Sequence, residues 1–154
     1  MKLSKNIKKS AISLEIGSKV KDQVLEELVG LLCDAYRLKD SDEILGAIIK
    51  RESKQSTGIG MGLAVPHAKT PVVKKLHVAF GLSRDGVDFD SIDGEKAHIF
   101  FILVSPRDVS GPHIMALAGI SRLIKHEEFR KALLSCSSEK EFFTLAEEAE
   151  KKYL

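Results

Sequence analysis

The segment Ala97-His98-Ile99-Phe100-Phe101-Ile102-Leu103-Val104 decides the fold class of this chain. Apart from its one histidine the segment is apolar throughout, and it is rich in β-branched and aromatic residues. A continuous run of this kind is typical of a strand whose two faces are both covered. We therefore expect residues 97–104 to form a buried strand in the middle of a sheet.

Weaker strand signals lie on the N-terminal side of this segment. Residues 76–82 (Leu-His-Val-Ala-Phe-Gly-Leu) alternate large apolar with smaller or polar side chains, which predicts a half-buried strand. Residues 87–89 (Val-Asp-Phe) predict another short strand, and Asp93-Gly94 is a turn signal that favours an antiparallel pair. At the N-terminus, either residues 1–10 are frayed or residues 11–16 add a short strand.

Helical patterns stand on both sides of the strand-rich middle. After Ser18, a plausible N-cap, apolar residues recur every three or four positions as far as Ala35. A second helix is expected from about Asp40, which forms a box-like start with Glu43, to Arg51-Glu52. A third helix is expected over 113–125, and two short ones at the C-terminus. Ser138 and Glu141 form a capping-box pattern that starts the last. The order predicts an α/β fold: a single mixed β-sheet flanked by helices on both faces, in one domain spanning 1–154.

Composition narrows the class of function. The chain has 154 residues and a net charge of +2, which is too small to argue for nucleic acid. It contains neither an apolar run of 18 residues nor the apolar core of a signal peptide near its start, so we expect no direct membrane insertion. Cys33 and Cys136 both fall in helical patterns without metal or redox spacing. We expect both to be reduced and mostly buried, in a cytoplasmic protein.

The segment Ser56-Thr57-Gly58-Ile59-Gly60-Met61-Gly62-Leu63-Ala64-Val65-Pro66-His67 carries the chemistry-bearing pattern. Alternating glycines permit positive φ and close backbone approach. Pro66 fixes its own φ and biases Val65 toward an extended conformation. His67 therefore lies at the end of a stiff segment, beside a loop rich in backbone N–H groups.

Several familiar sites are excluded by spacing. The third glycine, Gly62, comes too early for a dinucleotide fingerprint, and no helix-opening pattern follows it. No Gly-Lys-Ser or Gly-Lys-Thr completes a Walker A loop. A Gly-x-Ser-x-Gly nucleophile elbow and a His-Glu-x-x-His zinc motif are both absent.

The five histidines differ in their surroundings. His126 lies at a helix junction and is expected to be solvated or capping, while His77 and His98 lie inside strands and are expected to be structural. His67 and His113 each occupy a junction next to proline and glycine, where functional residues are frequent. A metal site joining His67, His113 and perhaps His98 is an alternative, although no carboxylate or cysteine stands at a recognisable spacing to complete it.

The spacing from Arg51-Glu52 through residues 56–60 to Leu63-Ala64-Val65-Pro66-His67-Ala68 resembles the phosphorylation-site signature of a known family. This family is the fructose/mannitol-type IIA component of the bacterial sugar phosphotransferase system, which includes nitrogen-regulatory IIA proteins. The resemblance covers about residues 11–150, and its Pro-His segment with the upstream arginine is the specific part. His113, opening an apolar helix, matches the family's second histidine.

The resemblance implies a phosphocarrier enzyme. His67 would accept a phosphoryl group from the phosphorylated carrier protein HPr, His113 would stabilise the phosphoryl oxygens or orient the nucleophile, and Arg51 would bind phosphate. Thr57, Gly58 and Gly60 are weaker candidates for phosphate binding. The group would then pass to a cysteine of a IIB component for sugar uptake, with neither metal nor cofactor required. Alternatively, the phosphorylation state of a regulatory IIA protein would control its binding to target proteins.

Partner proteins must bring their own phosphorylated side chain to His67. The resemblance therefore implies a shallow docking surface with exposed apolar residues around the histidine. Met61 and Met115 are the candidates for such contacts, because the methionine side chain adapts to different partners.

Overall fold

The structure, a computed structural model, describes residues 2–154. Within these residues six strands form one mixed sheet, in the order β1-β5-β6-β3-β2, with β4 also paired to β6. The two long strands, β5 (His77–Val87) and β6 (Ala97–Ser105), are antiparallel and form its centre. The expected central strand over residues 97–104 is confirmed, and its apolar side chains are buried.

The short strands complete the sheet on either side of this pair. β1 (Ile12–Ser13) runs parallel to β5. On the other side, β3 (Leu63–Ala64) and then β4 (His67–Lys69) run parallel to β6, while β2 (Gly58–Gly60) is antiparallel to β3. Parallel and antiparallel pairs therefore coexist, so the predicted mixed sheet is confirmed.

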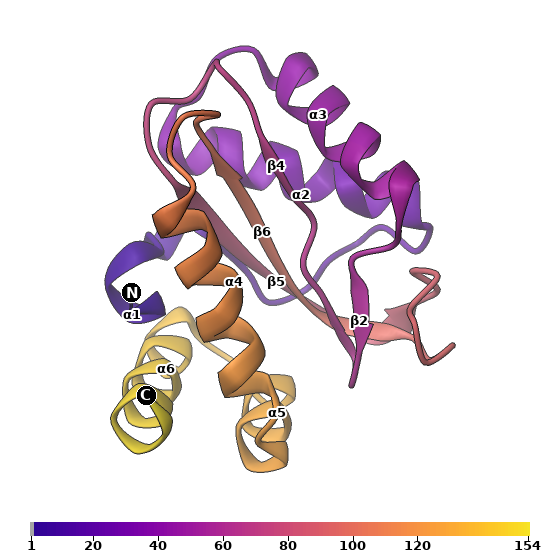
Figure 1. Cartoon of the computed structure of the whole chain (residues 1–154). Coiled ribbons are helices and arrows are strands. Elements are labelled where there is room, and N and C mark those ends of the chain that lie inside the picture. The colour runs from indigo at the N-terminus through magenta and orange to yellow at the C-terminus, as the bar shows by residue number, and fades with distance from the viewer. Residues whose placement is uncertain (1) are drawn as a thin grey trace.

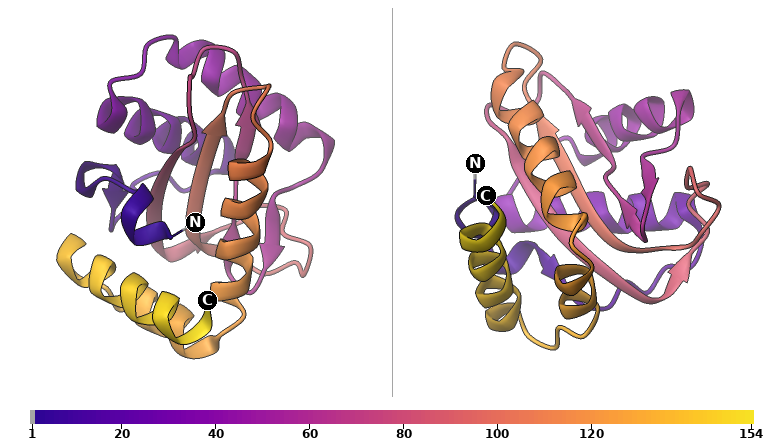
Figure 2. Two further views of the ribbon diagram at one scale, coloured as in Figure 1. Left: turned by 60° about the vertical axis from the view of Figure 1, so that its left-hand side comes forward. Right: turned by 60° about the horizontal axis from the view of Figure 1, so that its bottom comes forward.

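Helices cover both faces of the sheet, as predicted (Figures 1 and 2). On one face lie α2 (Lys21–Tyr36) and, beside it, α3 (Ser41–Lys54). The other face carries α4 (Gly111–Ile124), with α5 (Glu127–Leu134) and α6 (Glu139–Tyr153) following it at one end. The chain starts with the one-turn helix α1 (Leu3–Asn6) and the 3-10 turn η1 (Lys9–Ala11).

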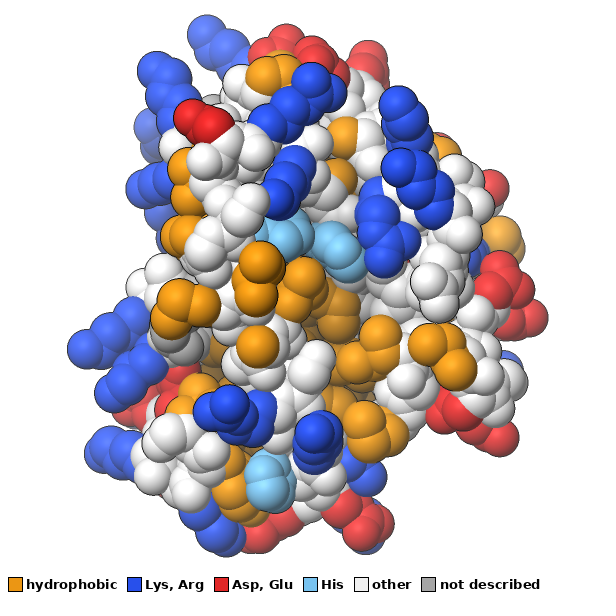
Figure 3. Space-filling model, viewed as in Figure 1, with side chains coloured by type: hydrophobic (Ala, Val, Ile, Leu, Met, Phe, Trp, Pro, Cys, Tyr) orange, Lys and Arg blue, Asp and Glu red, His pale blue; other side chains and the backbone are white. Residues whose placement is uncertain are grey.

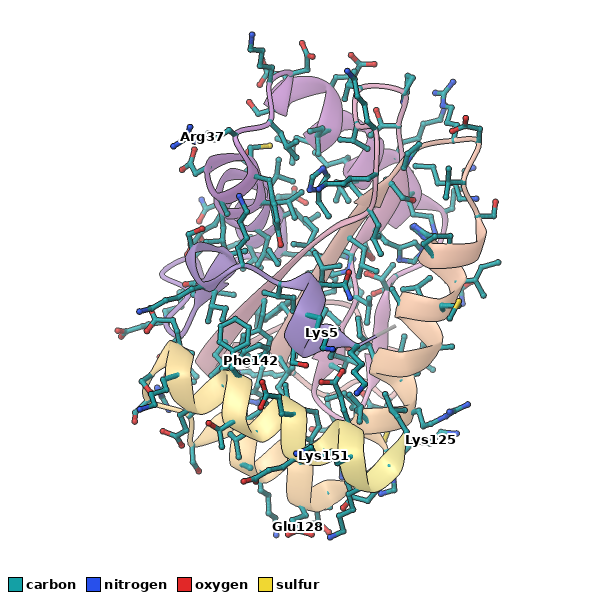
Figure 4. All side chains as sticks on the ribbon, turned by 90° about the vertical axis from the view of Figure 1, so that its left-hand side faces the viewer. Lys5, Arg37, Lys125, Glu128, Phe142 and Lys151 are labelled. Carbon is teal, nitrogen blue, oxygen red and sulfur yellow. The ribbon has the colours of Figure 1, made fainter. Side chains whose placement is uncertain are left out.

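Phenylalanines join the C-terminal helices to the sheet. Phe142 points inward from α6 in Figure 4, and its ring centroid lies 4.4 Å from that of Phe80 on β5. Phe80 in turn lies 5.0 Å from Phe101 on β6. Burying aromatic side chains contributes strongly to stability, so this contact fixes α6 against the sheet.

Two helix starts differ from the expectation. Ser18 is not an N-cap: α2 begins at Lys21, and the Ser18 hydroxyl donates instead to Glu27, whose carboxylate also accepts the N–H groups of Gly17 and Ser18. Asp40 does precede α3, but with a φ of 61° its side chain makes no capping hydrogen bond. The Ser138 cap is confirmed, because its hydroxyl accepts the Glu141 N–H at 3.0 Å.

Other expectations are corrected in loops and at the N-terminus. Residues 88–89 form no separate strand, since β5 ends at Val87. Cys136 lies between α5 and α6 and not in a helix, although both cysteines are buried and free, as expected. Fraying of residues 2–10 is not observed, because Leu3 and Ile7 are buried in the core; Met1 lies outside the described residues. The alternative, a short strand within residues 11–16, is present as β1.

Candidate functional site

His67 stands at the start of β4, where the chain joins the sheet beside β6. The Pro66 carbonyl accepts the Leu103 N–H at 3.0 Å, which fixes the backbone immediately before the histidine. The His67 Nδ1 lies 2.7 Å from the Val65 carbonyl oxygen. Because a carbonyl oxygen only accepts, Nδ1 carries the proton. In the neutral ring, Nε2 is therefore left with its free lone pair.

His113 comes to the same place from a distant part of the chain. β4 pairs with the last residues of β6, and the loop after β6 leads directly into α4, of which His113 is the third residue. The two imidazole centroids are 5.3 Å apart, with their planes at 60°. Behind the pair, the buried Ser105 hydroxyl lies 2.6 Å from His113 Nδ1. Two of the candidate residues thus form a histidine pair.

Both histidines favour the neutral form. Burial lowers the pKa of His67, and the nearby Arg51 charge lowers it further, while the Val65 hydrogen bond and Glu52 act in the opposite direction. Burial is also the main cause that lowers the pKa of His113 to about 4, with contributions from His67 and Lys69. At neutral pH the pair therefore presents uncharged imidazoles, each with one unprotonated ring nitrogen.

The histidine pair opens into a surface hollow of about 530 Å³. Figure 3 shows two adjacent histidines (pale blue), with Lys and Arg side chains above and to the right and a hydrophobic area below. We call this space the basic hollow because five cations and one carboxylate line it. Its lining comprises Glu43, Gly46, Ala47, Lys50, Arg51, Lys54, His67, Ala68, Lys69, Thr70, Arg107 and His113.

The cations of the basic hollow are available to a ligand. Within residues 2–154, none of the five forms an ion pair with a carboxylate. Arg51 donates from one guanidinium nitrogen to the Gln55 carbonyl at 2.8 Å, which orients its planar group. Lys69 donates to the Ser110 hydroxyl at 2.6 Å, just before α4. The arrangement suits an oxyanion placed beside the two histidines.

Thr57, Gly58 and Gly60 are not part of the hollow lining. The buried Thr57 gives both its N–H and its hydroxyl to the carboxylate of Glu52. The Gly58 N–H donates to the Ser56 hydroxyl at 3.0 Å. The donors of Thr57 and Gly58 are thus occupied within the protein, and none of the three residues lines the hollow, so the structure gives no support to their role in phosphate binding.

The glycines instead shape the β2–β3 hairpin, residues 58–64, which we call the glycine hairpin. Gly60 and Gly62 have φ of 98° and 75°, values that side chains resist. A Cβ on Gly58 would lie 2.4 Å from the Ser91 hydroxyl oxygen and 3.0 Å from its Cα. The Asp93 carboxylate accepts the Met61 N–H and closes the turn. Backbone geometry and close packing explain these glycines.

The remaining histidines, His77, His98 and His126, have structural surroundings. This was expected for His77 and His98, whereas His126 was expected to be solvated or capping and makes no side-chain capping hydrogen bond. His98 on β6 places its Nδ1 3.0 Å from the Ser83 carbonyl, His77 packs against Tyr36, and His126 stacks on Tyr153. Among residues 2–154 no group of three or more His, Cys, Asp or Glu side chains is arranged to hold a metal ion, so the metal alternative has no support. Across the same range, every helix is too short or too polar to span a bilayer.

The exposed apolar side chains include both expected methionines. Met61 on the hairpin and Met115 on α4 are exposed, and so is Ile114, next to His113. Met115 is therefore not part of the core, even though its neighbour Ala116 is fully buried.

The sequence analysis missed several residues of the basic hollow. On α3, Lys50 directly precedes Arg51 and Lys54 follows it by about one turn. Extending the Arg51 argument to its neighbour would have found Lys50, whereas Lys54 lies beyond the expected end of the helix at Arg51-Glu52. Ser105, Lys69 and Arg107 carry no comparable signal. Their relation to His67 depends on the pairing of β4 with β6 and on the loop before α4.

The fold agrees with the comparisons to known proteins. The model of the family "Phosphoenolpyruvate-dependent sugar phosphotransferase system, EIIA 2" matches residues 5–149, and the chain belongs to this family. It is 44% identical over 139 residues to the fructose-specific EIIABC component of Bacillus subtilis, covering 90% of this chain but only 22% of that protein. It is 39% identical to the fructose-specific EIIA component of Haloferax volcanii, over 82% of each chain.

A solved structure extends the likeness to three dimensions. The nitrogen regulatory protein IIA-Ntr from Neisseria meningitidis superposes with a TM-score of 0.86 at 28% identity, covering 94% of this chain and 98% of that one. The resemblance stated from the sequence is therefore confirmed at the level of the family and its fold.

Proposed function

We propose that this protein is the phosphocarrier of a fructose-type phosphotransferase system, with His67 as the residue that is phosphorylated. The observation that carries the proposal is the His67 hydrogen bond to Val65, which leaves Nε2 unprotonated beside five cations. Family membership and the identity to fructose-specific relatives supply the class of reaction.

The transfer step follows from the geometry. Nε2 of His67 attacks the phosphorus of a phosphohistidine on HPr, a bond from Nε2 to phosphorus forms, and the donor's N–P bond breaks. The electrons of that bond return to the donor ring, which carries a proton on its other nitrogen and so leaves as a neutral imidazole. The His67 ring keeps Nδ1–H on the Val65 carbonyl and takes up the positive charge. Phosphoryl transfer depends mainly on such positioning and on stabilising charge. Neither a metal ion nor a nucleotide takes part in this step.

Two neighbours stabilise the transferred group. We assign the Ser105 hydroxyl as the donor to Nδ1 of His113, an assignment that places the proton of the neutral His113 ring on Nε2, where it can be donated to a phosphoryl oxygen. Arg51 offers its remaining guanidinium N–H groups to the other oxygens. The pKa of about 4 keeps His113 neutral, so it stabilises the group as a hydrogen-bond donor and not as a charge.

The proposed acceptor is a cysteine of a IIB component, in the cytoplasm where HPr would act. The name of the Bacillus subtilis relative joins components A, B and C in one protein, which supports transfer to a B component. A regulatory role is the second candidate, supported by the likeness to IIA-Ntr. Transfer of phosphate from the phosphorylated protein to a fructose IIB component separates them, since the regulatory role does not require it.

Phosphorylation itself is tested with enzyme I, HPr and phosphoenolpyruvate, followed by intact-mass measurement. We expect one acid-labile phosphate on the wild type and none on His67→Ala. His98→Ala is the matched control, because His98 is also half-buried with Nδ1 on a backbone carbonyl but does not line the basic hollow. It should be phosphorylated like the wild type. Phosphate on His67→Ala would refute the proposal.

A further inference from the structure

The basic hollow extends well beyond the phosphoacceptor. Its volume of about 530 Å³ falls in the range of about 300–1,000 Å³ in which proteins hold small-molecule ligands. It follows one face of α3, because lining residues recur at positions 43, 46, 47, 50 and 54. From Glu43 to Lys54 this face is about 16 Å long at 1.5 Å per residue. A phosphoryl group on His67 would occupy only one part of it.

Along α3 the lining of the hollow carries opposite charges at its two ends. Lys50, Arg51 and Lys54 come from the C-terminal half of α3, and Lys69 and Arg107 face the same space. The carboxylate of Glu43 lies nearly three helical turns from Lys54, toward the start of α3, and forms no ion pair with any residue in the range 2–154. Cations bind phosphate, whereas a carboxylate repels it and accepts hydrogen bonds from hydroxyl groups.

Gly46 keeps the space between these ends open. It lies in the middle of α3 and is exposed, and a Cβ added there would meet nothing within 4 Å. Glycine in a helix interior costs roughly 0.5–1 kcal/mol relative to alanine. Packing therefore does not require this glycine, but a larger side chain at position 46 would project into the hollow that it lines.

We propose that the basic hollow binds a small phosphorylated polyol, such as a sugar phosphate, with its phosphate among the cations and its hydroxyl groups toward Glu43. A molecule held there covers the Nε2 side of His67 and excludes a phosphorylated donor protein. Binding depends only on the hollow, whereas its inhibitory effect rests on the proposed function.

The binding test titrates the ¹⁵N-labelled protein with fructose 1-phosphate, inorganic phosphate or fructose, each separately. We expect saturable amide shifts at Gly46, Ala47 and Ala68 with fructose 1-phosphate, at an affinity at least tenfold higher than for either other probe. Lys50→Ala should weaken both phosphate-containing probes. Glu43→Gln should strengthen inorganic phosphate and reduce the preference for the sugar phosphate. Absence of saturable shifts, or equal affinity for inorganic phosphate and fructose 1-phosphate, would overturn the proposal.

A leucine side chain placed at a helical glycine inside or outside the hollow gives a matched pair of variants. Gly46→Leu should abolish the preference for fructose 1-phosphate while inorganic phosphate still binds. Gly30→Leu is the control, since Gly30 is also helical with no atom within 4 Å of an added Cβ but lines no part of the basic hollow. Circular dichroism and thermal unfolding check that both variants fold. Undiminished preference in folded Gly46→Leu would contradict the proposed position of the ligand.

A transfer assay separates this inference from the proposed function. Saturating fructose 1-phosphate should slow phosphorylation of the wild type by HPr at least tenfold, and should have no such effect on folded Gly46→Leu. If no phosphorylation occurs even without the ligand, the proposed function fails and the binding result stands. If phosphorylation occurs but saturating ligand leaves its rate unchanged, the inhibitory part of the inference is wrong.

Discussion

The basic hollow and the glycine hairpin are neighbours in the sequence, but they use their polar groups in opposite ways. In the hairpin region the Thr57 hydroxyl, the Gly58 N–H and the Met61 N–H all have partners within the protein. In the hollow the cations lack carboxylate partners among residues 2–154, and His67 keeps Nε2 free. Satisfied polar groups build a structure, whereas unsatisfied ones facing solvent can bind a ligand. The glycine hairpin is therefore structural, whereas the basic hollow has the groups that can bind a ligand.

The largest expected effect is at His113, on the hollow side. His113→Ala removes the proposed donor to the phosphoryl group, and loss of one such donor typically costs about 100- to 1,000-fold in rate. We expect phosphorylation by HPr, followed by rapid-quench mass measurement, to slow by this amount. His113→Gln retains an amide donor and should recover part of the loss. If folded His113→Ala were phosphorylated at the wild-type rate, His113 would have no part in the transfer. The difference between the hollow and the hairpin would then rest on His67 and the cations alone.

A second effect concerns pH and folding. The pKa of His113 is about 4 in the folded protein, against an ordinary value of 6.5, so between pH 4 and 6.5 the unfolded chain binds more protons. Stability therefore decreases as pH falls through this window, by up to about 3 kcal/mol from His113 alone. His67 and His77, whose pKa values are also lowered by burial, act in the same direction.

Urea unfolding of the wild type and of His113→Gln at pH 7 and pH 4 measures this contribution. Between pH 7 and pH 4 His113→Gln should lose less stability than the wild type, because it lacks the imidazole whose pKa is lowered in the folded state. Equal losses in both proteins would show that His113 is not held neutral by the fold.

The smallest effect is expected on the hairpin side, at Thr57. Thr57→Val preserves the shape of the side chain but leaves a buried Glu52 oxygen without its hydroxyl donor. Such a loss costs about 1–3 kcal/mol of stability. We expect urea unfolding to show this decrease, while the phosphorylation rate per folded molecule stays within about twofold. A large decrease in the phosphorylation rate without loss of stability would instead indicate that Thr57 takes part in phosphate binding.

Local sequence patterns predicted the elements better than their assembly. The continuous apolar segment at 97–104 was enough to place β6, because such a run is stable only between two covered faces. Ser18 failed as an N-cap because Glu27, nine residues later, captures its hydroxyl and N–H groups. That contact depends on the path of the chain before α2 and has no signature in local spacing.

The same limit applies to the candidate site. His67 and His113 were identified separately by their junction positions, and the family resemblance related them to one another. Their 5.3 Å separation results from β4 pairing with β6 and from the loop that returns into α4. Thr57, a weaker candidate from the sequence, shows the converse difficulty. A polar residue next to a glycine-rich segment resembles a ligand until its partner, here the buried Glu52, is known.

The solvent exposure of the lysines around His67 affects the free energy with which a phosphoryl group on this histidine can be transferred. Lys50, Lys54 and Lys69 are exposed, so water weakens their attraction for an anion several-fold compared with a buried site. Buried, rigid cations around a phosphohistidine would stabilise the phosphorylated state so strongly that transfer of the phosphoryl group to an acceptor would become unfavourable. Solvated cations guide the group to the nucleophile but leave its transfer potential high. In the proposed function the phosphoryl group must pass on to an acceptor, so weak electrostatic stabilisation of the phosphohistidine favours the second transfer.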